Sequence, residues 1–240
     1  MVHSNSPKPI AVITGASKGI GLAIAHAFVA ENYSVLLCSR SEAHLEEASR
    51  EIRRANPEAD IKTYAADMGD AKQVKDFGNW CLQQGTPTIL VNNAGIYLPG
   101  NLSDAGEGNM EDTMNINFYS AYHLTRELLP AMKEQGHGHI FNISSIAGLG
   151  AYDGGGAYSV SKFALTGFSK NLRHELKATG IKVTTVFPGA VMTNSWAGFD
   201  NSNNRIMEAS DIAAMLVSAS KLSAAATVEE IVIRPQLGDL

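Results

Sequence analysis

The sequence contains few of the residues that disulfide-bonded and metal-binding proteins need. Among its 240 residues, only Cys38 and Cys81 are cysteines, too few for a disulfide framework or a thiolate cluster, and no run of histidine and cysteine has zinc-ligand spacing. We expect no bound metal and two buried, structural thiols. His137, His139 and His174 fall in a glycine-rich turn, at a strand start and on a helix surface, where we also expect structural roles.

Long apolar runs and an excess of positive charge are also missing. No stretch reaches the ~18 apolar residues that cross a membrane. Residues 1–9 are polar, with two prolines, and lack the apolar centre of a signal peptide. The formal net charge is −5, which gives no electrostatic basis for binding nucleic acid or an anionic membrane. We expect a cytoplasmic protein without a polyanionic partner.

Predicted strands and helices alternate along the chain. Short apolar runs predict strands, and apolar residues three and four positions apart predict helices. The expected strands are residues 10–14, 33–39, 61–66, 88–91, 139–144, 181–187 and 230–235. The expected helices are residues 19–31, 42–55, 71–84, 109–135 and 158–178, with a last helix from residue 210. This alternation is typical of a single α/β domain, 1–240, with a Rossmann-type doubly wound parallel sheet and helices on both faces.

Tyr158 and Lys162, four residues apart, begin one of the expected helices. This spacing places both side chains on one face of the helix, where their charges couple. A phenol titrates near ~10, so a useful fraction of phenolate at pH 7 needs a pKa depression of roughly 3 units, about 4 kcal/mol. A neighbouring ammonium together with a cationic cofactor could supply it. The pair alone is weak evidence, because the spacing also occurs by chance.

Three glycines, Gly15, Gly19 and Gly21, separate the first strand from the first helix. Glycine lets the backbone approach a pyrophosphate closely, and a helix start offers unpaired N–H groups and the positive end of the helix dipole. The spacing is G-x-x-x-G-x-G rather than the G-x-G-x-x-G of longer dehydrogenases. The alternative interpretation is a tight strand-to-helix turn without a ligand.

Together, these motifs resemble the short-chain dehydrogenase/reductase family. Five features carry the resemblance in order: the turn at 14–21, Asn92-Asn93-Ala94-Gly95, Ser145 thirteen residues before Tyr158, the Tyr-x-x-x-Lys pair, and Pro188-Gly189. The resemblance covers residues 10–235 and implies an oxidoreductase that interconverts a carbonyl and an alcohol with a nicotinamide cofactor. In that chemistry Ser145 and Tyr158 polarise the carbonyl. Tyr158 donates the proton, and Lys162 lowers the pKa of the phenol.

The family's catalytic set includes an asparagine, and two candidates, Asn115 and Asn117, lie within the longest expected helix. We choose Asn117, because the family pattern places this asparagine before an apolar residue and about 27 residues ahead of the serine. Asn117 matches this pattern with one extra residue in the turn between them. Asparagine is unfavourable in the middle of a helix, and a side chain that holds a water between Lys162 and solvent would justify it. The alternatives are a buried structural amide for Asn117 and a polar surface position for Asn115.

The residues after the second strand favour NADP(H) over NAD(H). An acidic residue about twenty positions beyond the glycines would bind the ribose 2′-hydroxyl of NAD, and none is present. Ser39, Arg40 and Ser41 stand there instead, with Lys18 inside the glycine turn, so two cations and two hydroxyls can surround a 2′-phosphate. In NADP-type members of the family, basic residues occupy the same two places. The alternative is that Lys18 and Arg40 are solvated surface charges.

The resemblance also implies which other residues hold the cofactor. Asp67 falls where the family contacts the adenine ring, although it could equally cap a loop. Val191 and Thr193 match positions that hold the nicotinamide carboxamide. The full expected set is Gly15, Ser17, Lys18, Gly19, Ile20, Gly21, Ser39, Arg40, Asp67, Asn93, Ala94, Gly95, Tyr158, Lys162, Pro188, Gly189, Val191 and Thr193.

Residues 190–210 mix large apolar side chains with asparagines, as a mobile lid over a substrate would; the alternative is a disordered surface loop. Residues 231–240 lack the Asp-Gly-Gly turn of many reductases in the family. This ending, with Trp196 in a short lid, resembles the branch that contains bacterial sepiapterin-reductase-like and 3-hydroxy-acid-dehydrogenase-like enzymes. Because the lid varies most within the fold, the sequence leaves open the substrate, and whether Trp196 or Asp239 contacts it.

Two further expectations concern partners and rival functions. In the family, the helices at 110–135 and 158–178 pack against their counterparts in a second subunit, so a homodimer or homotetramer is expected. The predicted reaction is the NADPH-dependent reduction of a carbonyl, or its reverse, on sepiapterin-like or 3-oxo/3-hydroxy substrates. The alternatives are a 3-oxoacyl carrier protein reductase and a non-catalytic NADP-sensing binding protein on the same fold.

Overall fold

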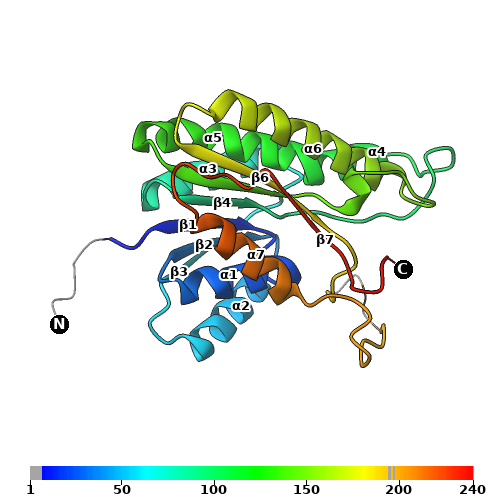
Figure 1. Cartoon of the computed structure of the whole chain (residues 1–240), viewed down its shortest axis with the longest axis horizontal. Helices are drawn as coiled ribbons and strands as arrows, with labels where there is room; N and C mark the ends of the chain where they lie inside the picture. Colours follow the sequence, from blue (N-terminus) through cyan, green and yellow to red (C-terminus); the bar gives the residue numbers. More distant parts are fainter. Residues whose placement is uncertain (1–6, 194–195, 197, 240) are drawn as a thin grey trace.

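A sheet of parallel strands forms the centre of the protein (Figure 1). The computed structural model describes residues 7–193, 196 and 198–239. Within them, seven strands are arranged in the order β3-β2-β1-β4-β5-β6-β7. The strands are β1 (Ile10–Thr14), β2 (Ser34–Ser39), β3 (Ile61–Ala65), β4 (Ile89–Asn92), β5 (Gly138–Ile143), β6 (Ile181–Pro188) and β7 (Glu230–Ile233). The order reverses between β1 and β4, which confirms the predicted doubly wound sheet.

Helices cover both faces of this sheet (Figure 1). One face carries α1 (Gly19–Ala30), α2 (Glu42–Ala55) and α7 (Ala209–Ser220). The other carries α3 (Ala71–Gln84), α5 (Ser120–Gln135) and α6 (Gly156–Leu176), with α4 (Asn109–Met114) leading toward α5. Successive side chains of each strand point to opposite faces of the sheet, so each strand contributes to both cores. In β1, Ala11 and Ile13 pack against the first layer of helices and Val12 packs against the second.

The helix expected at residues 109–135 is interrupted. One wide π-helical turn, η1 (Asn115–Tyr119), separates α4 from α5. The expectation of one continuous α-helix was wrong because side chains compete there for backbone groups. The Asn117 amide binds the backbone of Ile96, and the Ser120 hydroxyl donates to the Ile116 carbonyl at 2.6 Å. Turns of this kind are frequent at functional sites.

The helices differ in how they begin. Ser41 caps α2 by accepting from the His44 N–H, and Asp70 caps α3 by accepting from two N–H groups of its first turn. Lys18 precedes α1 in an extended conformation and makes no side-chain cap. The Lys18 side chain therefore caps none of the N–H groups in the first turn of α1.

Cys38 and Cys81 are buried, as predicted, and His139 is buried as well. Cys38 and Cys81 are buried and unpaired, and burial raises the pKa of Cys38 to about 12. His139 Nε2 lies 2.7 Å from the Thr184 hydroxyl, and burial lowers the pKa of this imidazole to about 3. Among the described residues, no cluster of histidine, cysteine and carboxylate side chains could hold a metal ion. No helix there is long and apolar enough to cross a membrane.

Candidate active site

The first two turns of α6 carry Tyr158 and Lys162 at the carboxyl edge of the sheet. The Lys162 Nζ lies 5.5 Å from the centre of the Tyr158 ring, so the predicted pair is in contact. Lys162 is only 4% exposed, and its Nζ donates to the Ile143 carbonyl at 2.9 Å. The end of β5 thus fixes the ammonium at the edge where open α/β sheets bind their ligands.

Ser145 follows β5 at the start of a short 3₁₀ turn, η2 (Ile146–Gly148). Its hydroxyl accepts the Ala147 N–H at 3.2 Å and is hydrogen-bonded to the Tyr158 phenol. The turn is held to α6 by Ser159, whose hydroxyl donates to the Ala147 carbonyl at 2.8 Å. These contacts fix the separation of the Ser145 and Tyr158 hydroxyls through backbone rather than through long side chains.

Asn117 is buried within η1 and bonds to two different parts of the site. Its amide oxygen accepts the Ile96 N–H at 2.7 Å. Its amide nitrogen donates to the Ile96 carbonyl at 3.0 Å and to the Ser161 hydroxyl at 2.9 Å. Ser161 donates in turn to the Tyr158 carbonyl at 2.7 Å. The asparagine therefore connects the loop after β4 to the first turn of α6.

Gly95 lies where the asparagine and the lysine approach each other. A Cβ at this position would stand 3.3 Å from the Asn117 Oδ1 and 3.6 Å from the Lys162 Nζ. Both groups therefore adjoin the same point beside the Gly95 backbone. The structure brings together all four residues predicted to be catalytic: Asn117, Ser145, Tyr158 and Lys162.

Burial dominates the electrostatics of the site. It raises the pKa of Tyr158, an effect that the hydrogen bond from Ser145 opposes and the neighbouring Tyr97 phenol increases. Burial also lowers the pKa of Lys162 to about 8. The sequence predicted that Lys162 lowers the pKa of the Tyr158 phenol, whereas in this structure burial of the phenol has the largest effect and raises that pKa.

The glycine turn after β1 is joined to the loop after β4. The Asn93 amide donates to the carbonyls of Thr14 at 2.9 Å and Gly15 at 3.2 Å, and the Thr14 hydroxyl accepts the Ala94 N–H at 3.0 Å. A side chain at Gly21 would overlap the Gly15 carbonyl, so only glycine fits there. The predicted cofactor residues of the two loops therefore form one surface.

Four more of the predicted cofactor residues lie in the glycine turn, at the start of α1 and at the end of β6. Ser17 is half-buried in the glycine turn, and Ile20, in the first turn of α1, packs against the core. Pro188 ends β6, and the Gly189 N–H donates to the Ile233 carbonyl at 2.8 Å.

The predicted 2′-phosphate residues follow adjacent strands. β1 and β2 pair in parallel, so Lys18 after β1 and Arg40 after β2 belong to the same edge of the sheet. Both are exposed, and within the described residues neither has a carboxylate partner. Ser39 is half-buried and donates to the Ser41 carbonyl at 3.3 Å.

Asp67, expected near the adenine, makes a contact inside its own loop. Its Oδ1 accepts the Gly69 N–H at 2.9 Å, and its N–H donates to the Gln73 side chain at 2.9 Å. This bond matches the loop-capping alternative. The adenine contact stays a prediction.

The segment after β6 returns to the glycine turn. A Cβ at Gly19 would stand 3.2 Å from the Thr193 methyl group, so Thr193 lies against the turn. Val191 is buried and pairs with Met207 in an isolated bridge. Of the predicted lid, residues 190–210, Asn194, Ser195 and Ala197 lie outside the described residues. The Trp196 ring lies 5.4 Å from the Phe199 ring, nearly at right angles.

The C-terminal tail after β7 fastens this lid segment. The Arg205 guanidinium donates to the carbonyls of Gly238 and Asp239, both at 2.9 Å. The Asp239 carboxylate pairs with Arg234, and a Cβ at Gly189 would stand 3.0 Å from its Oδ1. The tail therefore contacts both the end of β6 and the lid segment.

Sequence reasoning missed a buried polar ladder beneath the site. The Asn92 amide donates to the Thr125 hydroxyl at 3.0 Å and to the Asn142 amide oxygen at 2.7 Å, and Asn142 donates to the Ser169 hydroxyl at 2.6 Å. Asn92 and Asn142 are paired in register on β4 and β5. Two asparagines at equivalent ends of apolar strands were the signal in the sequence. The ladder fixes α5 and α6 to the sheet where the site begins.

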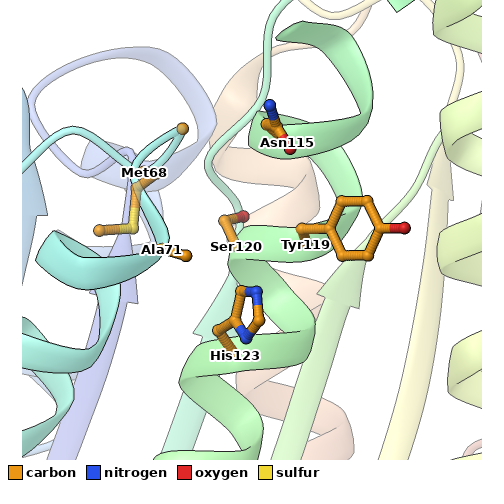
Figure 2. Close-up of a pocket in the computed structure, with 7 residues that line it drawn as sticks. Met68, Ala71, Asn115, Tyr119, Ser120 and His123 are labelled. Atoms are coloured by element: carbon orange, nitrogen blue, oxygen red, sulfur yellow. The ribbon is translucent and has the colours of Figure 1, made fainter. Parts of the chain in front are cut away.

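A hollow of about 230 Å³ lies away from this chemistry (Figure 2). It is lined by Met68, Gly69, Ala71, Asn115, Tyr119, Ser120 and His123. Asn115, the rival to Asn117, is exposed there. None of the four predicted catalytic residues lines the hollow. The four predicted catalytic residues gather at the edge of α6 instead, and the active site stays predicted there.

Fold and site together are those of a Rossmann-type oxidoreductase, and comparisons with known proteins agree. The family model for short chain dehydrogenase matches residues 9–204. The chain is similar to a sepiapterin reductase of Chlorobaculum tepidum, with 37% identity over 97% of this chain and 98% of that protein. A metagenomic short-chain oxidoreductase solved in complex with NADP matches with 30% identity and a TM-score of 0.84, over 96% of this chain and 98% of its own.

A variant of actinorhodin polyketide ketoreductase, solved with NADPH, matches with 28% identity and a TM-score of 0.88, over 97% of this chain and 98% of its own. The protein belongs to the short-chain dehydrogenase family. It is therefore an oxidoreductase that acts on alcohol or carbonyl groups. The predicted resemblance, including that to sepiapterin-reductase-like enzymes, is confirmed.

Proposed function

We propose that the protein is an NADPH-dependent reductase that converts the carbonyl of a small molecule into an alcohol, or catalyses the reverse. Three contacts carry this proposal: Asn117 and Lys162 meet beside Gly95, Lys162 lies next to the Tyr158 ring, and Tyr158 is hydrogen-bonded to Ser145. The similarity to a sepiapterin reductase supports a reductase of sepiapterin-like compounds, and 3-oxo compounds are the other expected class of substrate. The similarity to structures solved with NADP or NADPH supports the cofactor.

The hydroxyls of Ser145 and Tyr158 form the reacting pair. A carbonyl oxygen placed between them accepts a hydrogen bond from each, which stabilises the negative charge that develops on it. Tyr158 then donates its proton to this oxygen, and the hydrogen bond from Ser145 stabilises the resulting phenolate. NADPH, when bound, supplies the hydride that adds to the carbonyl carbon.

Lys162 and Asn117 complete the set behind the tyrosine. With a pKa of about 8, Lys162 can give and take a proton near neutral pH. The Asn117 amide nitrogen already donates two hydrogen bonds, and its oxygen accepts one. The oxygen keeps one free acceptor position, which is where the proposed water on the path from Lys162 would bind.

The residues at the carboxyl edge fit the cofactor. The overlap that any side chain at Gly21 would cause leaves bare backbone beside the start of α1, as the approach of a pyrophosphate requires. Lys18 and Arg40 are exposed at the ends of neighbouring strands, where they would hold the 2′-phosphate.

The first test replaces Tyr158 with phenylalanine. Since the variant lacks the proton donor, we expect Tyr158→Phe to lower turnover of NADPH with sepiapterin, a 3-oxo ester or a 3-oxoacyl carrier protein by about 100- to 10,000-fold. NADPH binding should stay nearly unchanged. Tyr33→Phe, whose ring packs on Phe28 in another part of the fold, is the matched control. Retained turnover in Tyr158→Phe would exclude the mechanism, and tight NADPH binding without turnover of any carbonyl would favour the sensing alternative.

The second test concerns the choice of cofactor. Each charge-assisted contact with the 2′-phosphate is worth roughly 1.5–3 kcal/mol, so Lys18 and Arg40 together imply a preference for NADPH over NADH of hundreds-fold or more. The double variant Lys18→Ala/Arg40→Ala should weaken NADPH binding and leave NADH binding almost untouched. Ser39→Asp should further favour NADH. Equal dissociation constants for NADPH and NADH in the unmodified protein would show that the two cations are only solvated charges.

A further inference from the structure

Two tyrosines that sequence reasoning passed over stand beside the reacting phenol. The Tyr97 ring lies 5.1 Å from the Tyr158 ring at 82°, an edge-to-face contact. Tyr152 is joined to Tyr97 through a hydrogen bond between their phenols. Tyr97 and Tyr152, here called the tyrosine pair, come from two separate loops, one after β4 and one before α6.

The two loops are tied to each other. The Gly100 N–H donates to the Gly154 carbonyl at 3.1 Å, and the Gly154 N–H donates to the Asn101 side chain at 3.3 Å. A side chain at Gly156 would overlap the Gly100 carbonyl, so the backbones touch. This contact fixes the two loops relative to α6, whose first turn carries Tyr158.

Each tyrosine is also fixed within its own loop. Asn117 forms hydrogen bonds with both the N–H and the carbonyl of Ile96, the residue before Tyr97. A Cβ at Gly155 would stand 2.9 Å from the Tyr152 ring, so that ring lies against the glycine backbone. The rings are thus preorganised and would lose little freedom on binding a ligand.

The tyrosine pair is nonetheless open to solvent. Tyr97 is 45% exposed and Tyr152 is 46% exposed, although both rings are fixed by their loops. Two held, half-exposed aromatic rings next to a proton donor form a surface for a ligand ring rather than part of the core.

We infer that Tyr97 and Tyr152 determine substrate specificity, by stacking on a flat conjugated ring attached to the carbonyl that Ser145 and Tyr158 bind. The inference rests on the proposed function. Ring–ring contacts with offset or edge-to-face geometry add about 0.5–1.5 kcal/mol beyond buried area, about two- to tenfold for each ring. A saturated, puckered ring of the same size buries a similar apolar area, but it lacks this additional ring–ring contribution to binding.

Acetophenone and cyclohexyl methyl ketone test this inference, because they differ in the flatness and conjugation of one ring. The measured quantity is the ratio of their kcat/KM values, which we expect Tyr97→Leu and Tyr152→Leu each to lower by about two- to tenfold. Tyr152→Phe keeps the ring and should keep the ratio within about twofold. Tyr33→Leu, at a tyrosine that packs on Phe28 in another part of the fold, is the control. Thermal unfolding checks that each variant folds.

Two outcomes would overturn the inference. If Tyr97→Leu lowers kcat equally for both ketones, the role of Tyr97 is to position Tyr158 and not to contact the substrate ring. If both leucine variants keep the ratio of the unmodified protein, the tyrosine pair does not contact the ring.

Measuring how tightly the two ketones bind, rather than how fast they react, tests this inference independently of the proposed function. In Tyr158→Phe loaded with NADPH, ligand-observed NMR gives the dissociation constants of both ketones without turnover. A preference for acetophenone that Tyr97→Leu abolishes supports the tyrosine pair even if the unmodified protein reduces neither ketone. Equal dissociation constants in Tyr158→Phe and in its Tyr97→Leu derivative would count against it.

Discussion

At the scale of single residues, burying the Lys162 ammonium in the site lowers the stability of the folded protein. The folded protein holds its pKa at about 8 because the ammonium is buried, while an unfolded chain keeps the ordinary value of 10.5. Between pH 8 and 10.5 the unfolded chain therefore binds more protons, and the stability of the folded protein rises with pH through this window. Below pH 8 the full cost of burying the charge remains.

Lys162→Met should therefore stabilise the protein at pH 7 while abolishing turnover. A pKa difference of this size corresponds to a gain of up to about 3 kcal/mol in the free energy of unfolding. The gain should shrink as the pH rises from about 8 towards 10.5. Urea unfolding at about pH 7 and about pH 9.5 measures it. Lys177→Met, at the exposed end of α6, is the control, and a gain that does not depend on pH would contradict the assignment.

At the scale of elements, the sequence predicted the strands and most helices because apolar periodicity is local information. The motifs also predicted which side chains share the site. The π-helical turn was missed because the Asn117 amide binds Ile96, 21 residues earlier. The tyrosine pair was missed because its two loops carry no periodicity that relates them. The contact between Arg205 and the tail spans 33 residues and has no sequence signal either.

That last contact predicts a role for the tail in holding the lid segment. Arg205→Ala removes two hydrogen bonds to Gly238 and Asp239, each worth about 0.5–1.5 kcal/mol. We expect an increase in KM of about three- to tenfold with a smaller change in kcat. We also expect faster proteolysis within residues 190–210. Arg54→Ala, at an exposed position on α2, is the control. Unchanged KM and proteolysis would show that the tail does not restrain the lid.

At the scale of the whole molecule, assembly and a cytoplasmic location stay predictions. Tyr119, Val160 and Phe163 are exposed apolar side chains on η1 and α6, two elements that pack on each other. Exposed apolar groups of this kind are usual where a second subunit binds. They support the expected homodimer or homotetramer.

Phe163→Glu should then dissociate the assembly, because it would place a charge inside an apolar contact. Light scattering after size-exclusion chromatography gives the mass at micromolar concentration. Leu102→Glu, at an exposed leucine in the loop before α4, should leave the mass unchanged. A monomeric unmodified protein would refute the expectation directly.

The π-helical turn has a consequence for how this chain tolerates insertions and deletions. A π-helical turn contains one residue more than an α-helical turn. Deleting a single residue within 115–119 would let α4 and α5 join as regular helix, and each residue of α-helix turns the chain by about 100°. An α-helical turn needs one residue fewer for the same full turn, so the buried faces of α4 and α5 would keep roughly their present directions. A relative with one residue fewer here could therefore keep both helices in place, and it would lose only the wide turn in which Asn117 lies.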